Sequence, residues 1–357
     1  MKNKKLKKVL KYIFIIALFL FSFWYLLKDL NLNEIKNNID KMNIYFLIPA
    51  VLLIFGQIFV QGFCYIVMSK GLEVKLNPIK ASKYVSVDLF FSQLTPFAIG
   101  GQPMMVYEMK SKDGIEVAKS TPMVLIYSFM NKLALIVMAI VVSIFYFNDF
   151  FAQSDSKIMI ILLIFGVCSN IIIASLNIMF MFMGSLMYKI GIRLILWFYK
   201  HNLIKNPLAK VRSLRVMVKN YKESNKYFKN HKLTLLFVFL LCVLKRVITF
   251  SVAYVIYKSF GLKEHSFIYI ISAQTVYALV SDSFPIPGGI GAAEVSIKHL
   301  YDGIYETAPT GISGLAAVLV RFISYYLLII ITGITTMGVM FRKNGKKVYL
   351  KDEESMQ

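Results

Sequence analysis

Six apolar runs, each long enough to cross a lipid bilayer as a helix, dominate this sequence. About 20 consecutive apolar residues are needed to span the hydrocarbon core of a membrane. The composition agrees, because 57% of the residues are hydrophobic and only 17% are charged, whereas soluble domains carry about 25% charged residues. We therefore predict an all-α polytopic membrane protein with six full spans. They cover residues 9–27, 44–68, 121–147, 158–184, 233–258 and 311–341.

Lysine and arginine are distributed unevenly among the segments between these runs. The segments 1–11, 70–83, 110–119, 185–232 and 342–357 hold 30 of them, whereas 28–43, 148–157, 259–265 and 300–310 hold 5. Cytoplasmic loops carry such an excess of positive charge. The bias predicts that both termini are cytoplasmic, and it accounts for the net charge of +22 without a nucleic-acid partner.

Two further apolar pieces, 84–107 and 266–299, are interrupted by proline and glycine. The first contains LTPFAIGGQP (94–103), and the second contains FPIPGGIGAAE (284–294), after which a new helix is expected near Ala292. Non-helical backbone at membrane depth is tolerated only inside protein or beside a wet cavity, because its unpaired polar groups are costly in lipid. The flanking charges predict two re-entrant hairpins. The first enters from the cytoplasm and the second from outside.

The order of these pieces predicts an inverted-topology repeat. Residues 1–147 and 148–341 each contain two spans, a broken hairpin and another span, and a cytoplasmic tail follows at 342–357. In secondary transporters, broken segments at matching positions of two inverted halves point to the substrate site. The alternative is that two loops rich in glycine and proline lie at matching positions by chance.

The connector 185–232 is strongly basic and belongs to the cytoplasmic side. Its stretch MYKIGIRLILWFYK (187–200) mixes basic and apolar residues at helical spacing, which is typical of a helix lying on a membrane surface. Basic residues there would be attracted to anionic lipid. A plain orientation signal explains the same charges equally well.

Ionisable residues at membrane depth are expensive and indicate function or an ion pair. They are Asp88, Glu108, Lys132, Lys245, Arg246, Asp282, Glu294 and Arg321. The carboxylates lie near the two breaks and the cations lie on full spans, so pairs such as Asp88 with Arg246 or Glu294 with Arg321 are plausible. Arginine suits a phosphate, because its guanidinium binds phosphate through two parallel hydrogen bonds. The N-terminus of the helix near Ala292 also suits an anion such as a lipid phosphate.

Sequence motifs of soluble enzymes are missing. There is no dinucleotide-binding, phosphate-binding or zinc-protease motif, and the longest non-apolar segment is the basic connector. We therefore expect no catalytic residues, no metal and no cofactor.

The two interrupted stretches, LTPFAIGGQPMMVYEMKSKDG (94–114) and FPIPGGIGAAEVS (284–296), resemble the hallmark motifs of a bacterial membrane family. This is the lysylphosphatidylglycerol synthase transmembrane region, or flippase-like family, which includes the membrane half of the multiple peptide resistance factor. The resemblance covers roughly residues 10–340. It implies a protein of the bacterial plasma membrane that moves an anionic or aminoacylated phospholipid, such as lysyl-phosphatidylglycerol, between leaflets. In the fused relatives this protects the cell against cationic antimicrobial peptides.

The sequence ends at Gln357, and the cytosolic synthase domain of the fused relatives is not present in it. Three alternatives stay open: a phosphatidylglycerol lysyltransferase-type enzyme or its subunit, a flippase for polyprenyl-phosphate-linked sugars, and a non-transporting regulator of envelope synthesis. The oligomeric state is left open. The motifs and the intramembrane charges together give the candidate substrate-binding residues. They are Asp88, Thr95, Gly100, Gly101, Gln102, Arg246, Gly288, Gly289, Glu294 and Arg321, with Glu108, Lys132 and Asp282 as secondary candidates.

Overall fold

The computed structural model describes residues 32–147, 150, 157–182, 184–200, 207–282 and 284–342, and within them every element is a helix. The predicted span 9–27 and most of the predicted tail lie outside these residues. The order of elements is α2 (Leu32–Lys41), η1 (Ile44–Phe46), α3 (Leu47–Lys70), α4 (Pro78–Gln93), η2 (Pro96–Ala98), α5 (Gly101–Asp113), α6 (Val117–Phe147), α7 (Lys157–Phe182), α8 (Gly184–Lys200), α9 (Pro207–Asn230), α10 (Lys232–Ser259), α11 (Phe267–Ser281), η4 (Pro287–Gly289), α12 (Ala292–Ile304), α13 (Ile312–Arg321), η5 (Phe322–Leu327) and α14 (Leu328–Phe341).

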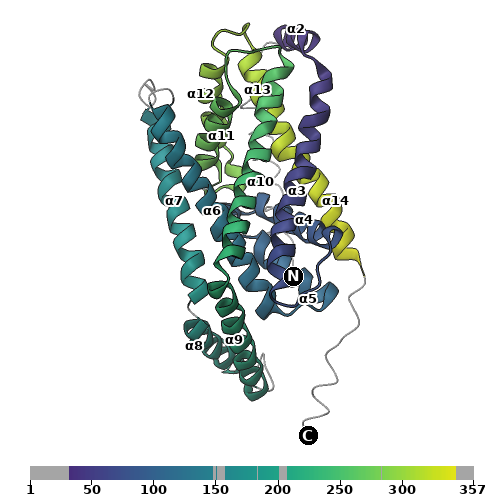
Figure 1. Ribbon diagram of the computed structural model, residues 1–357, viewed down its shortest axis with the longest axis vertical. Helices are drawn as coiled ribbons and strands as arrows, with labels where there is room; N and C mark the ends of the chain where they lie inside the picture. The colour runs from purple at the N-terminus through teal and green to yellow at the C-terminus, as the bar shows by residue number, and fades with distance from the viewer. Residues whose placement is uncertain are drawn as a thin grey trace, which may run out of the picture.

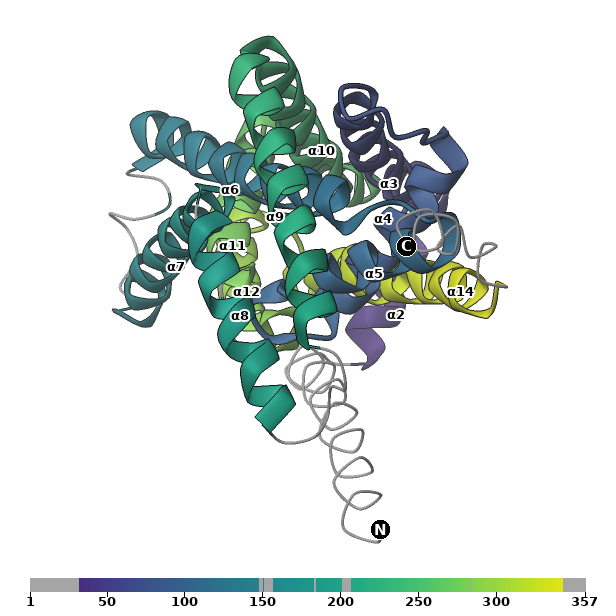
Figure 2. The same ribbon diagram turned by 90° about the horizontal axis from the view of Figure 1, so that it is seen from below.

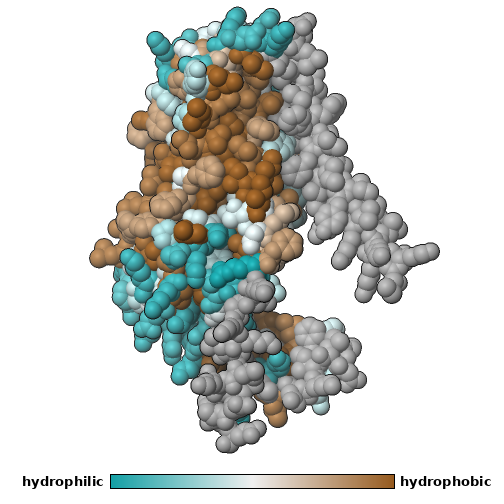
Figure 3. Space-filling view, turned by 90° about the vertical axis from the view of Figure 1, so that its right-hand side faces the viewer, coloured by the Kyte–Doolittle hydropathy of each residue, from teal (hydrophilic) through white to brown (hydrophobic). Residues whose placement is uncertain are grey.

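Five helical segments of the described chain are long and apolar enough to cross a membrane. They are Ile44–Lys70, Val117–Tyr146, Ile160–Met179, Lys232–Ser259 and Ile312–Phe341, and they coincide with the five predicted spans that the structure describes. The last one contains a π-helical turn, η5. Figure 3 shows an apolar band on one face of the molecule between two hydrophilic ends, as a bilayer requires. The chain is therefore an all-helical multi-pass membrane protein.

The first interrupted piece forms a hairpin, which we call the first hairpin: α4, η2 and α5. The two arms pack against each other, and Lys80 Nζ near the start of α4 lies 3.1 Å from Asp113 Oδ1 at the end of α5. The hairpin therefore begins and ends at the same level of the molecule. It is longer than the predicted 84–107, because Asn77 caps α4 by accepting a hydrogen bond from Lys80 N and because α5 continues to Gly114, whose φ is +69°.

The second interrupted piece forms the second hairpin: α11, η4 and α12. Its arms also pack together, and Gln274 Nε2 donates a 3.0 Å hydrogen bond to Tyr301 Oη across them. Beyond the two ends, Thr307 donates a hydrogen bond to the Glu264 carboxylate, so this hairpin too begins and ends at one level. Its new helix starts at Ala292, as predicted, but it runs to Ile304, beyond the predicted end at residue 299.

The two hairpins approach the middle of the molecule from opposite ends. In Figure 1 α5 lies in the lower half, and α11 and α12 lie in the upper half. Their tips, η2 and η4, are in contact. The long helices α3, α6, α7, α10 and α14 surround the hairpins, and α10 packs on α3, α6 and α11. The fold thus brings the two proline- and glycine-rich breaks together at its centre.

The basic connector forms two helices, α8 and α9, which pack against each other at Gly191 and Leu214. Figure 1 shows this pair at the lower end, and Figure 2 shows it crossing beneath the bundle. The predicted helix at 187–200 lies within α8, whose Ile190, Leu194 and Trp197 are exposed on one helical face. Its contact with a membrane surface stays a prediction.

Asp113 joins the lower end of the first hairpin to the end of α14. Burial raises the pKa of this carboxyl, but hydrogen bonds from Tyr84 Oη (2.6 Å) and Lys80 Nζ and the charge of Arg342 hold the pKa below its ordinary value of 3.8. A lowered pKa stabilises the fold above the ordinary value, and this stabilisation is lost as the pH falls below it.

We expect Asp113→Asn to lower the thermal midpoint by about 2–4 °C at pH 7, the effect of losing roughly 1 kcal/mol. The difference from wild type should shrink as the pH falls below 3.8 toward the lowered pKa of the folded carboxyl. Thermal unfolding in detergent at pH 7 and pH 3 measures both values. An equal difference at the two pH values would show that the carboxylate charge is not what stabilises this end.

Candidate functional site

The tip of the first hairpin is a turn that two ordinary residues adopt in an unusual conformation. Thr95 is extended (φ −119°, ψ 146°), Pro96 follows, and Phe97 and Ala98 then have φ of 57° and 55°. Residues with a Cβ rarely adopt positive φ, because this backbone conformation costs about 1–2 kcal/mol per residue. Such strain persists where the surrounding structure enforces it, often at functional sites. It lies here at the point where the two hairpins touch.

The tip of the second hairpin repeats this turn. Ile286 is extended (φ −119°, ψ 142°), Pro287 follows, and Gly288 and Gly289 both have φ of 64°. The two tips thus share the same order of one extended residue, one proline and two left-handed residues. Glycine is the usual choice for such positions, and the second hairpin uses it at both.

The two tips predict opposite responses to substitution. Ala98→Gly should raise stability by about 0.5–1 kcal/mol, because it removes the strain of positive φ at the expense of some chain entropy. Gly289→Ala should lower stability by about 1–3 kcal/mol, because a Cβ there would meet Ser281 O at 2.5 Å in addition to the positive φ.

Thermal unfolding of the two variants and of Gly303→Ala tests this pair. Gly303 lies inside α12 with open space around it, so its substitution should be neutral or slightly stabilising. A loss of stability in Ala98→Gly would contradict the assigned turn.

A cavity of about 320 Å³ lies where the tips meet. Residues of α3, α4, α5, α6, α7, α10, α11, α13, η5 and α14 line it together with the two tips. Eight candidate residues from the sequence lie in its wall: Asp88, Gln102, Lys132, Arg246, Asp282, Gly288, Gly289 and Arg321. Four cations of the wall, Lys132, Lys245, Arg246 and Arg321, face two carboxylates, Asp88 and Asp282. Arg321 is itself paired with Glu294, which lies outside the wall, so three cations remain against two carboxylates and the cavity carries a net positive charge.

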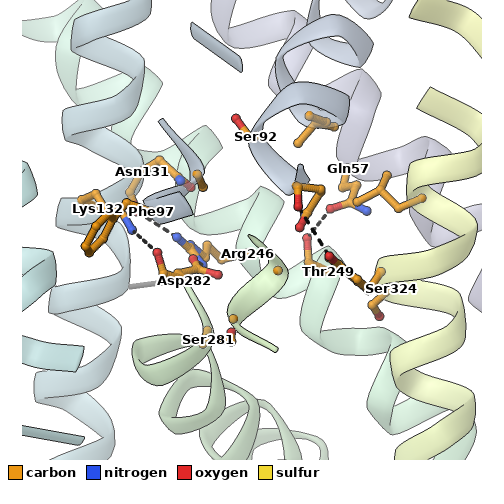
Figure 4. Close-up of a pocket in the computed structure, with 18 of the residues that line it drawn as sticks. Gln57, Ser92, Phe97, Asn131, Lys132, Arg246, Thr249, Ser281, Asp282 and Ser324 are labelled. Carbon is orange, nitrogen blue, oxygen red and sulfur yellow. Dashed lines mark hydrogen bonds and ion pairs between the residues drawn. The ribbon is translucent and has the colours of Figure 1, made fainter. Parts of the chain in front are cut away.

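Arg246, Lys132 and Asp282 form one charged cluster of the cavity (Figure 4). Arg246 Nη1 donates to Asp282 Oδ2 at 2.8 Å, and Lys132 Nζ lies 3.3 Å from the backbone oxygen of Asp282. The Arg246 side chain is 6% exposed, whereas that of Asp282 is 37% exposed. In the described chain, Nε of Arg246 has no hydrogen-bond partner. This cluster can hold an additional anion, because two cations share one carboxylate.

Arg321 and Glu294 form a second ion pair, one of the two pairs that the sequence made plausible. The Nη2 to Oε1 distance is 3.1 Å, and Glu294 is 0% exposed. Arg321 also donates to Tyr277 Oη and to Gly288 O, both at 2.7 Å, so it holds the second tip in place. Glu294 does not line the cavity. Its Oε2 accepts a 2.5 Å hydrogen bond from Gly291 N, so the protein's own carboxylate occupies the helix N-terminus where a lipid phosphate was expected.

Asp88 is not paired with Arg246, so that possible pair is wrong. Its Oδ2 accepts a hydrogen bond from Gln61 Nε2 at 2.9 Å, and Ser92 Oγ lies 3.4 Å from Oδ1. The physical reason is the rotation of α4, which turns Asp88 toward α3, while Asp282 at the end of α11 reaches Arg246 first.

The remaining candidates shape the first hairpin without lining the cavity. Thr95 Oγ1 accepts a 2.9 Å hydrogen bond from Gly100 N and so closes the turn. Gly101 packs on the backbone of Asp88 so closely that a Cβ would overlap its carbonyl oxygen. Glu108 is buried in α5 and lies 4.0 Å from Lys112. Among the candidates of this hairpin, Gln102 does line the cavity, and its Nε2 donates to Ser128 Oγ at 2.8 Å.

Several cavity residues were not chosen from the sequence. The neutral polar ones include Gln57, Gln61, Ser128, Asn131 and Asn177, and the charged one is Lys245. A weak signal was present, since Gln57 and Gln61 are one helical turn apart in an apolar span and Asn131 precedes Lys132. Within the described residues, no three His, Cys, Asp or Glu side chains gather as a metal site would require.

Comparison with curated proteins finds no match for this chain. The family model described as "Lysylphosphatidylglycerol synthase TM region" matches residues 9–332, in agreement with the resemblance of the two interrupted motifs. Because this match extends over nearly the whole chain, the protein belongs to the lysylphosphatidylglycerol synthase TM region family.

Proposed function

We propose that the protein is a lipid transporter of the flippase type, which moves an anionic or aminoacylated phospholipid between the leaflets of the bacterial plasma membrane. The observation that carries the proposal is the cavity at the contact of the two hairpin tips, where three cations besides the Glu294-paired Arg321 stand against two carboxylates. Charged groups at membrane depth are expensive and face a substrate path when they are not fully neutralised by each other. Membership of a family associated with membrane phospholipids supports a lipid as the ligand.

The headgroup phosphate would bind the cluster of Arg246 and Lys132, with Lys245 as the third cation on that part of the wall. Guanidinium suits this role because it can offer two donors to one phosphate. The acyl chains would stay in lipid. Ile99 and Leu176 support this arrangement, because both line the cavity and are 53% and 41% exposed. Gln102 of the first hairpin and Asn177 of α7 both donate to Ser128 Oγ. The first tip therefore lies beside α7, on the side of the cavity where Ile99 and Leu176 are exposed.

Transport would follow from an inverted repeat of the two halves, 1–147 and 148–341, that rock around the cavity. The matching backbone turns of the two tips support such a repeat, as does their approach from opposite ends of the molecule. The end that holds α8, α9 and Asp113 would face the cytoplasm because of its basic residues, and both termini would lie there.

Reconstitution tests the proposal. The purified chain is placed in liposomes that contain labelled lysyl-phosphatidylglycerol, phosphatidylglycerol or a polyprenyl-phosphate-linked sugar, and an impermeant reagent follows each lipid's appearance in the outer leaflet. We expect exchange at least tenfold faster than in protein-free liposomes for at least one anionic or aminoacylated phospholipid. No acceleration for any lipid would refute the proposal. Formation of lysyl-phosphatidylglycerol from lysyl-tRNA and phosphatidylglycerol would instead identify an enzyme.

A further inference from the structure

Asp88 differs from the two other carboxylates near the hairpin tips. Asp282 is paired with Arg246 and Glu294 with Arg321, each within 3.1 Å. No cation of the described chain lies within 4 Å of the Asp88 oxygens, although Asp88 is only 6% exposed and lines the cavity. A buried charge without a counter-ion is strongly unfavourable. Neutrality at this site therefore requires either a bound cation or a proton on the carboxyl.

The surroundings of Asp88 are rich in oxygen atoms that can accept a donor or coordinate a cation. Gln61 donates to Asp88 through Nε2, and its own Oε1 has no hydrogen-bond partner in the described part of the chain, although Gln61 is 1% exposed. Ser92 Oγ lies beside the carboxylate, and Gln57 and Thr249, which are joined by a 2.9 Å hydrogen bond, line the same part of the cavity. Figure 4 shows Gln57, Thr249 and Ser92 on the side of the view away from Lys132 and Asp282.

The titratable groups around Asp88 do not neutralise it directly. Lys245 of α10 acts on it through its charge and lines the same cavity, and Tyr65 of α3 and Tyr127 of α6 also interact with it electrostatically. Tyr65 and Tyr127 carry no positive charge. Lys245 is already shared between Asp88 and the Asp282 cluster, where Arg246 repels it.

We propose that Asp88, Gln61 and Ser92 form a subsite for one monovalent cation, supplied either by an ammonium group on the lipid headgroup or by a free alkali ion. The subsite lies in the same cavity as the cationic cluster of Arg246 and Lys132. An ammonium-bearing phospholipid would fill both places at once, with phosphate at the cationic cluster and ammonium at Asp88. A free ion would instead couple its own binding to that of the lipid. The ammonium source rests on the proposed transport function, whereas the subsite itself does not.

The full chain in detergent tests the subsite without any transport measurement. Thermal unfolding is followed at pH 8 with increasing sodium chloride or methylammonium chloride, and tetraethylammonium chloride keeps the ionic strength constant. For the wild type we expect one of the two smaller cations to raise the midpoint by about 2–4 °C at several times its dissociation constant. A response to methylammonium alone identifies the headgroup ammonium as the source, and a response to sodium alone identifies a free ion.

Asp88→Asn should abolish this response, and Asp302→Asn, a change of the same type at an exposed position, should retain it. Asparagine has nearly the same shape and is cheaper to bury, so the variant should fold; Gln61→Met provides a second variant that should weaken the response. Lys245→Met should lower the half-saturating cation concentration by up to about tenfold, because it removes a like charge.

Three results would overturn the subsite: no response of the wild type to either cation, the same response in Asp88→Asn, or loss of the response in Asp302→Asn. The first is also what a permanently protonated Asp88 would give. A cation response that depends on Asp88, together with no lipid exchange in liposomes, would refute the proposed transport and leave the subsite standing.

Discussion

Replacement of Arg246 by methionine is expected to slow lipid exchange by about tenfold to a hundredfold while the protein stays folded. A hydrogen bond to a charged group contributes about 1.5–3 kcal/mol, and each 1.4 kcal/mol corresponds to a factor of ten. The fold should tolerate the change, because Asp282 is 37% exposed to the cavity and keeps Lys132 close by. Initial exchange rates in liposomes, at equal amounts of reconstituted protein, measure the effect.

Arg342→Met is the matched control for this variant. Arg342 is 51% exposed at the end of α14, where it contacts Asp113, and it does not line the cavity. Its substitution should leave exchange within about twofold of wild type. If Arg246→Met exchanged lipid as fast as Arg342→Met, the cationic cluster could not be the phosphate site.

Arg321→Met should act on stability, with a loss of about 3–5 kcal/mol in the free energy of unfolding. The variant removes the guanidinium partner of Glu294, which is 0% exposed, and it removes the donors to Tyr277 and Gly288. The expected readouts are a much lower thermal midpoint and a low yield of folded protein from the membrane. Arg321→Lys should recover only part of the loss, because one ammonium cannot match the planar fork of three donors.

The double variant Arg321→Met/Glu294→Gln separates the buried charge from the lost contacts. It removes the buried carboxylate charge that Arg321 no longer balances, so it should be more stable than Arg321→Met alone even though it carries one more substitution. A thermal midpoint of Arg321→Met equal to that of the wild type would contradict the assigned ion pair. A double variant no more stable than the single would show that the contacts to Tyr277 and Gly288 dominate.

The contrast between these two arginines shows what the sequence could predict. Both lie in the middle of apolar spans, and both were selected because charge is expensive there. The sequence gives the depth of a residue but not the direction of its side chain, because spans that are apolar nearly all around show little preferred face. Of the two pairs that the sequence made plausible, the structure contains Glu294–Arg321. It does not contain Asp88–Arg246, because Arg246 pairs with Asp282 and Asp88 with Gln61.

The hairpins were predictable for a clearer reason. Clusters of proline and glycine interrupt helices, so the clusters around Pro96 and Pro287 marked both tips, and apolar length marked the five described spans. The ends of the hairpins were misplaced by several residues, because caps such as Asn77 act outside the apolar run. Neutral residues such as Asn131 and Asn177 could not be assigned to the cavity, since an amide in a span serves helix packing as readily as a binding site.

Photo-crosslinking tests most directly whether the headgroup occupies the cavity between the hairpin tips. Wild-type protein in liposomes is irradiated with a phospholipid that carries a photoreactive group on its headgroup, and mass spectrometry maps the modified residues. We expect adducts on residues of the cavity wall, such as Asn131, Lys132 and Ser281, and competition by the unlabelled lipid. Adducts confined to the exposed outer residues of the spans, such as Phe145 and Ile334, would contradict a headgroup site at the centre of the fold.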